Sequence, residues 1–239
     1  MTLTPKNLFL AQVIAHLSLI TMFFYASFFE WAISIFVYFL TGCVGGSMGY
    51  HRLLSHRSWK TSPFAEKLIT LLSTVGLSGS AISWVSTHRK HHKFVDTEKD
   101  PHSPSFKGFL KMHYMSMFES TDIKYASDLI RNDFYRFQHK YYFEINFVWA
   151  FIVVILFQDF YALVYAWLAP AAILWTFTSC IITISHRNKF IHNDIILSLL
   201  VWGEGYHHNH HRNPEKYRFG KYDVSGKLIE LFKKNEIKI

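Results

Sequence analysis

Four long apolar runs, arranged as two closely spaced pairs, dominate the pattern of hydrophobic and polar residues along this 239-residue chain. A helix of about 20 apolar residues crosses a bilayer core. Only Glu30 separates the first two runs, and only Gln158 and Asp159 separate the second two. We therefore predict four transmembrane helices in two hairpins, with spans at residues 8–29, 31–49, 141–157 and 160–185. Pro170 leaves the start of the fourth helix open, because proline begins helices as well as interrupting them.

Two weaker apolar stretches, Phe64–Val85 and Asp194–Gly203, complete the pattern. The first contains Glu66, Lys67 and two glycines, and the second is too short to cross a bilayer. We expect both to lie along the membrane interface or to dip in and return. No internal repeat or flexible linker interrupts the sequence, so the prediction is one all-α integral membrane domain over residues 1–239.

The basic residues predict the orientation of this domain. Of the 25 Lys and Arg residues, one precedes the first span, 14 lie between spans two and three, and 10 follow span four. Because basic residues stay on the cytoplasmic side, we expect both termini and the cap segments 50–140 and 186–239 to be cytoplasmic. The prediction is a multi-pass protein of the bacterial inner membrane or the endoplasmic reticulum.

The composition agrees with a membrane protein. Hydrophobic residues make up 50 % of the chain and charged residues only 18 %, which excludes a disordered protein and a disulfide-stapled scaffold. The net charge of +8 indicates basic residues next to the membrane surface and does not indicate nucleic-acid binding. Cys43 and Cys180 lie inside apolar runs, so we expect buried free thiols.

Histidines supply the candidate chemistry. The chain has 15 of them, and ten fall in four places on the predicted cytoplasmic side. Two clusters have the spacing His-x-x-His-His, which places the three side chains within an arc of about 100° on a helix. The adjacent pair within each cluster diverges by about 100°, which suits two ions a few ångströms apart. His51 and His56 are about 140° apart on an α-helix, so they either serve separate ions or straddle a helix end.

We predict nine metal ligands, which exceed the four to six that one ion binds and therefore imply two ions. Nitrogen ligands disfavour Mg²⁺ and Ca²⁺ and suit Fe, Zn or Cu, with dioxygen chemistry expected of an iron pair and hydrolysis of a zinc pair. The nine are His51, His56, His88, His91, His92, His186, His207, His210 and His211. Candidates to orient them through the second ring nitrogen are Asp96, Glu98, Asp100, Glu204 and Asp223.

The other histidines are not assigned to the centre. We expect His16, His113, His139 and His192 to be packing or surface residues, leave His102 open, and exclude His208 as the extra member of its cluster.

Five motifs together resemble the membrane fatty-acid desaturases, in particular the stearoyl-CoA Δ9 branch. They are HRLLSHR at 51–57, WVSTHRKHHK at 84–93, DPH at 100–102, WGEGYHHNHH at 202–211 and YRF at 217–219. The resemblance implies a helical membrane enzyme with a cytosolic cap and a centre of two Fe ions held by the nine histidines, which zinc could replace during overexpression. It implies no catalytic side chain beyond the ligands, and a bent acyl tunnel shaped by Trp84 and Thr178.

The same resemblance implies the reaction and the partners. An oxygen-dependent acyl-lipid or acyl-CoA desaturase inserts a cis Δ9 double bond, with two electrons from a separate donor such as a ferredoxin or a small cytochrome. The partners expected are a fatty acyl substrate linked to CoA, a carrier protein or a lipid, this donor and membrane lipids, with no nucleic acid. The chain departs from the family pattern at Ile182, where the family has Asn; at Thr87, where it has Asp; and at His208, where it has Asn.

Two alternatives remain at this point. A membrane hydroxylase or ketolase acting on a lipid or carotenoid would use a similar cluster, since the outcome depends on how substrate is positioned. A metal transporter or sensor is the remote alternative, because transporters place their ligands near the membrane midplane and these clusters lie on one predicted face.

Overall fold

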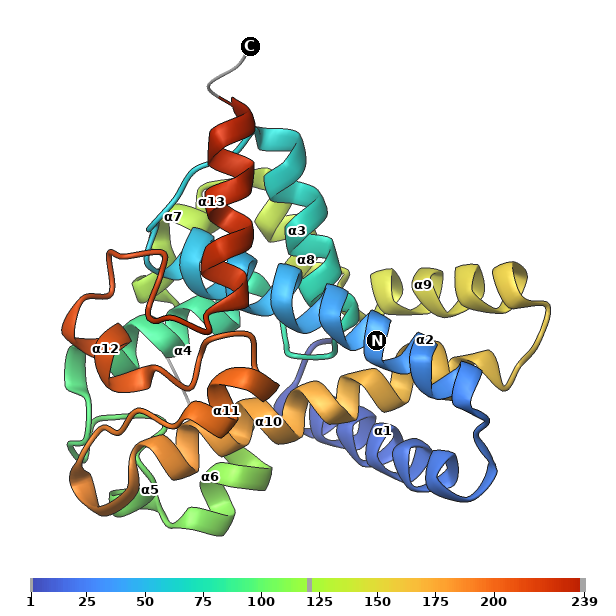
Figure 1. Cartoon of the computed structure of the whole chain (residues 1–239), viewed down its shortest axis with the longest axis horizontal. Coiled ribbons are helices and arrows are strands. Elements are labelled where there is room, and N and C mark those ends of the chain that lie inside the picture. The colour runs from blue at the N-terminus through green and yellow to red at the C-terminus, as the bar shows by residue number, and fades with distance from the viewer. Residues whose placement is uncertain (1, 120–121, 237–239) are drawn as a thin grey trace.

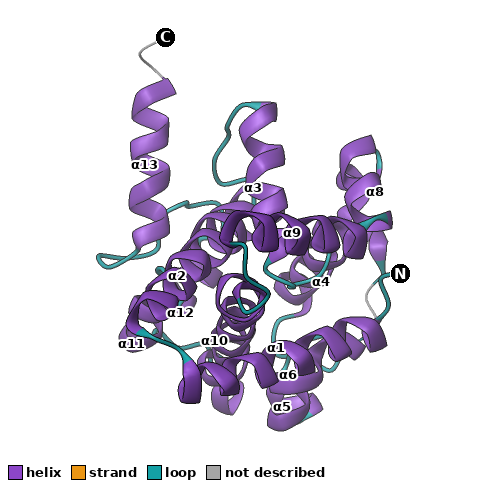
Figure 2. Cartoon of the chain, turned by 90° about the vertical axis from the view of Figure 1, so that its right-hand side faces the viewer, coloured by secondary structure: helices purple, strands orange, loops and turns teal. Residues whose placement is uncertain are grey.

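The computed structural model describes residues 2–119 and 122–236, which form helices and loops without a strand (Figures 1 and 2). Two helices, η1 and η4, are π-helical, and η2, η3 and η5 are short 3₁₀ turns. The bounds are α1 Pro5–Tyr25, α2 Phe28–Tyr38, η1 Phe39–Ser55, α3 Pro63–Val75, α4 Ala81–Phe94, α5 Pro104–Lys107, α6 Phe109–Met115, η2 Ser116–Phe118, η3 Ile123–Ala126, α7 Ser127–Ile130, α8 Asp133–Lys140, α9 Tyr142–Phe157, η4 Val164–Leu168, α10 Ala169–Ser185, η5 Arg187–Lys189, α11 Ile195–Leu200, α12 His207–Arg212 and α13 Val224–Glu236.

Three of these helices are long and apolar enough to cross a membrane, which supports the prediction of a membrane protein. They are Pro5–Tyr25, Phe28–Ser55 and Val164–Ser185. The predicted third span corresponds to α9, which has 16 residues and joins α8 at a bend of 75°. It makes a fourth span only if this bent pair crosses as one unit. The structure thus establishes the all-helical class and three candidate spans.

The breaks between helices differ from the expected positions. The turn predicted at Glu30 lies earlier, at Ala26 and Ser27. Ser27 and Glu30 form a capping box, in which each side chain accepts a hydrogen bond from the backbone of the other residue, so the carboxylate starts α2. Pro170 lies in the first turn of α10, within a continuous apolar helix. The expected interfacial stretch Phe64–Val85 is two helices, α3 and α4, joined by a turn.

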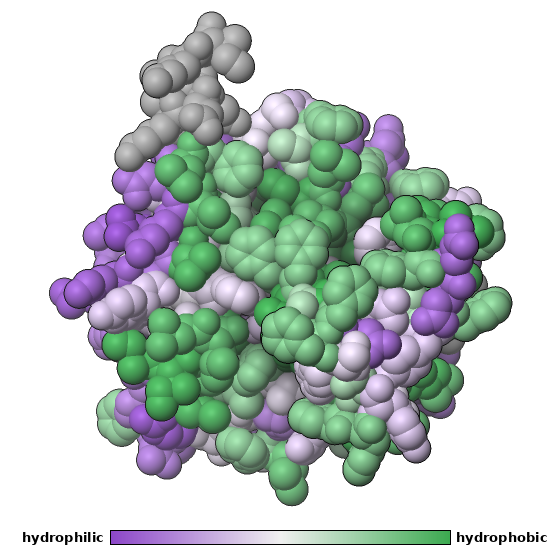
Figure 3. Space-filling view, turned by 45° about the vertical axis from the view of Figure 1, so that its right-hand side comes forward, coloured by the Kyte–Doolittle hydropathy of each residue, from purple (hydrophilic) through white to green (hydrophobic). Residues whose placement is uncertain are grey.

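The apolar helices pack through small residues and leave large ones on the outside. Helix α1 packs on η4 and α10, where Ala162, Ala166 and Ala169 are buried and allow close approach. Phe24 and Phe28, by contrast, are 76 % and 89 % exposed. Figure 3 shows hydrophobic residues over much of one face, with hydrophilic residues mainly along its left side and in a strip on the right. A lipid-facing surface accounts for this contiguous exposure.

The π-helix η1 carries the chain from the apolar bundle to the histidines. Its backbone hydrogen bonds close at longer spacing than in an α-helix, as where the N–H of His56 donates to the carbonyl of His51 at 3.2 Å. Gly45 and Gly49 let α3 lie directly against it. An added Cβ would lie 2.5 Å from the Ser73 nitrogen at the first position and 2.5 Å from Ile69 Cγ2 at the second. This contact fixes η1 beside α3 and α4.

Candidate metal centre

Nine histidines from four segments meet in two groups, within each of which one ring nitrogen per residue lies within 4.8 Å of the others. We name them the five-histidine group and the four-histidine group. The first contains His51, His56, His88, His92 and His210, and the second contains His91, His186, His207 and His211. These are the nine residues selected from the sequence, so the structure brings the whole predicted set together.

The two His-x-x-His-His clusters divide between the groups in opposite ways. On α4, His88 and His92 join the five-histidine group, and His91 joins the four-histidine group. On α12, His207 and His211 join the four-histidine group, and His210 joins the other. Residues four apart share a helix face and adjacent residues diverge. Each helix therefore bridges both groups.

His51 and His56 lie in the same group, with ring centroids 4.9 Å apart. The expectation that they serve separate ions is therefore wrong, and the alternative that they straddle a helix end is correct, since His56 follows the last residue of η1. The angle of about 140° assumed α-helical geometry. In a π-helix a hydrogen bond joins residues five apart, so both side chains leave on one side.

Three carboxylates hold histidines of these groups through Nδ1. The separations are 2.7 Å from Glu204 to His51, 2.9 Å from Asp100 to His91, and 3.1 Å from Asp96 to His186. An Nδ1–H that donates to a carboxylate leaves a lone pair on Nε2. Of the two other candidates, Asp223 contacts Arg52 instead, and Glu98 is exposed.

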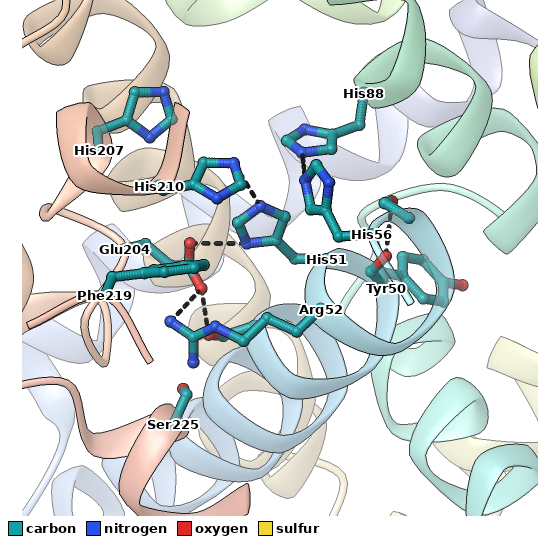
Figure 4. A network of polar contacts seen from close by, with 12 residues as sticks. Tyr50, His51, Arg52, His56, His88, Glu204, His207, His210, Phe219 and Ser225 are labelled. Carbon is teal, nitrogen blue, oxygen red and sulfur yellow. Dashed lines mark hydrogen bonds and ion pairs between the residues drawn. The ribbon is translucent and has the colours of Figure 1, made fainter. Parts of the chain in front are cut away.

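Sequence reasoning missed Arg52, which is fully buried next to His51. Its guanidinium lies 3.2 Å from Glu204 Oε1, 3.1 Å from Asp223 Oδ1, and 4.2 Å from the centre of the Phe219 ring (Figure 4). Arg52 thereby joins the carboxylate behind His51 to the start of α13. The sequence did contain a signal for Arg52: it follows the candidate ligand His51 at the end of an apolar run. A charge buried at such a position needs partners of opposite charge.

The ring nitrogens are suited to a transition metal. The Nε2 atoms of His51 and His210 are 3.0 Å apart, and those of His186 and His207 are 2.8 Å apart. Lone pairs at this distance repel unless an ion or proton lies between them. Burial lowers the pKa of the six candidate ligands on α4 and α12, that of His92 to about 2, so that these six rings are neutral at pH 7. Neutral, crowded imidazoles fit Fe, Zn or Cu.

We expect the metal-free protein to lose stability steadily as the pH falls from 6.5 towards 4. Burial lowers the pKa of His102 from 6.5 to about 4 and that of His92 to about 2. Below pH 6.5 the unfolded chain therefore binds protons that the folded protein does not, and each such histidine lowers the free energy of unfolding by up to about 1.4 kcal/mol per pH unit. Thermal unfolding of chelator-treated protein at pH 8, 6 and 5 measures this, and an unfolding temperature that is unchanged or rises on acidification would contradict it.

A cavity of about 410 Å³ runs beside the histidine groups. Its exposed lining residues, Pro5 and Ile123, mark the open end. We infer that the other end is blind, because it is lined by the buried Tyr38, whose hydroxyl donates to the carbonyl of Leu200 at 2.6 Å, and by Trp202. Trp84, Thr178 and Ile182 line its wall, and the Trp84 ring stacks on His88 with centroids 4.9 Å apart. The two residues expected to shape a tunnel thus lie on this cavity.

The histidines left outside the predicted set lie outside both groups. His16 bonds to Gln12 and Thr176, His139 bonds to Ser80, and His208 is exposed. His102, which the sequence left open, lies on the cavity wall with its ring centroid 5.2 Å from that of His91.

Comparison with known proteins agrees with the site. The family model of the fatty acid desaturases matches residues 29–223. The chain is 32 % identical over 230 residues to the sn-1 stearoyl-lipid 9-desaturase of Anabaena variabilis, covering 87 % of this chain and 83 % of that one. It is 31 % identical over 228 residues to the sn-2 palmitoyl-lipid 9-desaturase of Nostoc sp. (85 % and 79 % covered) and to an acyl-CoA 5-desaturase of Anemone leveillei (85 % and 70 %).

Proposed function

Because the chain belongs to the fatty acid desaturase family, we propose that it inserts a cis Δ9 double bond into a saturated fatty acyl chain, using two iron ions, dioxygen and two electrons from a separate donor. Fatty acid desaturation itself follows from the relatives, which are named acyl-lipid and acyl-CoA desaturases. The observation that carries the finer proposal is the pair of histidine groups beside a largely apolar cavity.

We propose all nine histidines of the two groups as the metal ligands. When bound, the ions would activate dioxygen, the oxidant that removal of hydrogen from a methylene requires and that side-chain acid–base chemistry cannot replace. The carboxylates Asp96, Asp100 and Glu204 fix the ring orientation of three ligands, as the Nδ1 distances indicate. No further side chain is proposed to act in catalysis.

The cavity is proposed to position the acyl chain. Trp84 lies flat against His88, and Thr178 lines the same cavity, so an acyl chain threaded past them runs beside the histidines. The blind end at Tyr38 limits how far the chain enters, and depth selects which carbon–carbon bond lies at the metals. Largely apolar walls exclude water from that bond.

The electron donor is proposed to be a separate protein, such as a ferredoxin or a small cytochrome. Three of the histidines, His56, His92 and His211, are only half-buried, and they are not among the histidines that line the cavity. Electrons can thus reach the centre from the surface without crossing the substrate cavity. The carrier is proposed to be CoA or a membrane lipid, as in the relatives' names.

We further propose four spans in two hairpins, with both termini and the histidines cytoplasmic. In a background lacking Cys43 and Cys180, Ser27→Cys and Asp159→Cys should react with a membrane-impermeant thiol reagent added outside intact cells. Glu98→Cys, which is exposed in the segment between the second and third spans, should react only after permeabilisation. Labelling of Glu98→Cys in intact cells would place the second histidine cluster outside the membrane and would contradict the proposed topology.

Expression with a suitable donor, followed by fatty-acid profiling and metal analysis, tests the proposal as a whole. The expected result is a new cis Δ9 acyl chain and two irons per protein chain. Hydroxylated or ketolated lipid without a new double bond would favour the alternative oxidation, and active protein with a single metal ion would rule out the nine-ligand centre.

A further inference from the structure

The charged groups behind the two histidine groups differ in number and in sign. In the five-histidine group one carboxylate, Glu204, contacts a ring, and Arg52 lies 3.2 Å from it. In the four-histidine group two carboxylates, Asp100 and Asp96, contact rings. Within residues 2–119 and 122–236, no lysine or arginine forms an ion pair with either of these two.

Neutral groups donate hydrogen bonds to the aspartates of the four-histidine group. Asp100 is fully buried and accepts hydrogen bonds from the backbone N–H groups of Asp96 at 2.9 Å and His102 at 2.8 Å, besides His91 Nδ1. The hydroxyl of Ser103 donates to Asp96 at 3.3 Å. These donors stabilise negative charge without cancelling it.

Arginines lie beside the five-histidine group, each paired with carboxylates. Arg52 is buried against Glu204, and its second carboxylate, Asp223, accepts from the backbone N–H groups of Phe219 and Gly226. Arg89 pairs with Asp128 at 2.6 Å and also donates to the carbonyls of Leu54 at 2.7 Å and Ser55 at 3.0 Å, directly before His56. The one carboxylate that contacts a ring of the five-histidine group therefore has a buried guanidinium beside it.

This asymmetry acts on a bound metal. A carboxylate that accepts from Nδ1–H makes the imidazole a stronger donor, and a buried anion stabilises the higher charge of a nearby cation, while a buried guanidinium opposes it. We propose that iron in the four-histidine group is oxidised first, so that a half-oxidised centre holds ferric iron there and ferrous iron in the five-histidine group. The proposal rests on the two-iron function proposed above.

The test uses full-length protein loaded with ⁵⁷Fe, reduced without oxygen, and titrated with ferricyanide to one electron per chain. That electron passes from iron to ferricyanide, which becomes ferrocyanide. The expected product is a mixed-valent centre, seen as a half-integer-spin EPR signal and as equal ferric and ferrous Mössbauer components. Wild-type protein that shows no mixed-valent state under these conditions overturns the proposal without recourse to any variant.

Two isosteric variants assign the oxidation state to a group. Asp96→Asn should change the ferric Mössbauer component, and Glu204→Gln the ferrous one; the reverse result overturns the proposal. Asp96→Asn should also lower the maximum mixed-valent fraction about threefold, since it removes charge from the group that is oxidised first. Glu66→Gln, whose carboxylate bonds to Tyr135 on α8, is the matched control and should leave both components unchanged.

Iron content and desaturation are measured on the same preparations, which separates the two levels of the proposal. Two irons and normal double-bond formation without the predicted order of oxidation would overturn this inference alone. A single iron per chain, or no desaturation in wild-type protein, would overturn the proposed function instead.

Discussion

His88→Ala and His210→Ala are each expected to abolish double-bond formation and to release metal from the five-histidine group. His88 Nε2 lies 2.8 Å from that of His56, and His210 Nε2 lies between those of His51 (3.0 Å) and His92 (2.8 Å). Removing either ring opens one side of the group and leaves its partners without a shared ion. Since losing even an outer partner of a ligand costs about 10- to 100-fold in metal affinity or activity, loss of a ligand should cost more.

The matched control is His16→Ala. The His16 ring bonds to the carbonyl of Gln12 at 2.7 Å and to the hydroxyl of Thr176 at 3.2 Å, and it belongs to neither group. We expect this variant to keep most of its activity and both metals. Fatty-acid profiles and metal content of the three purified variants decide the matter, and equal tolerance of all three substitutions would refute the assignment of ligands.

Gly42→Ala should shorten the acyl chain that the enzyme accepts. Gly42 lies at the blind end of the cavity, where an added Cβ would be 3.1 Å from Tyr38 Cε2, 3.2 Å from Leu174 Cδ1 and 3.3 Å from Trp202 Nε1. These side chains must move into the cavity to make room. Because one methylene of pocket space is worth about 1–3 kcal/mol, kcat/KM for the longest good substrate should fall about 10-fold or more, with preference passing to a shorter chain.

Gly46→Ala provides the comparison, one turn along η1. Its Cβ would meet only the Thr41 carbonyl oxygen, at the ordinary contact distance of 3.6 Å, although Gly46 lines the same cavity. It should keep the wild-type chain-length profile. Competition assays with saturated substrates of graded length give the result, and an identical profile for Gly42→Ala and Gly46→Ala would mean that the blind end does not limit chain length.

Much of the centre could be predicted from sequence because its clusters lie on regular helices. The spacing His-x-x-His-His fixes directions on α4 and α12 whatever surrounds them, and so predicted that His91 and His92 would diverge. Apolar length likewise predicted helices near three of the four expected spans, since bilayer thickness sets that length.

The π-helical course of η1 could not be predicted in this way. The apolar run from Phe39 onward fits an α-helix equally well, and the π-helix is seen only together with tertiary contacts such as the close approach of α3 at Gly45 and Gly49. The role of Arg52 also depended on the fold, because Asp223 lies 171 positions away in the chain. Both the π-helix and the pairing of Arg52 depend on contacts between segments that are distant in the sequence, and a local sequence pattern does not contain these contacts.

The candidate ligand histidines are spread from residue 51 to residue 211, so neither group can be complete until most of the chain has been synthesised. The five-histidine group needs His210, and the four-histidine group takes three of its four members from residues beyond α10. A nascent chain inserted as far as α10 therefore offers four ligand histidines to the five-histidine group and one to the four-histidine group. Neither group is complete before α12 is synthesised, so a chain terminated before His207 would lack the histidines that the proposed two-iron centre needs, whatever the supply of metal.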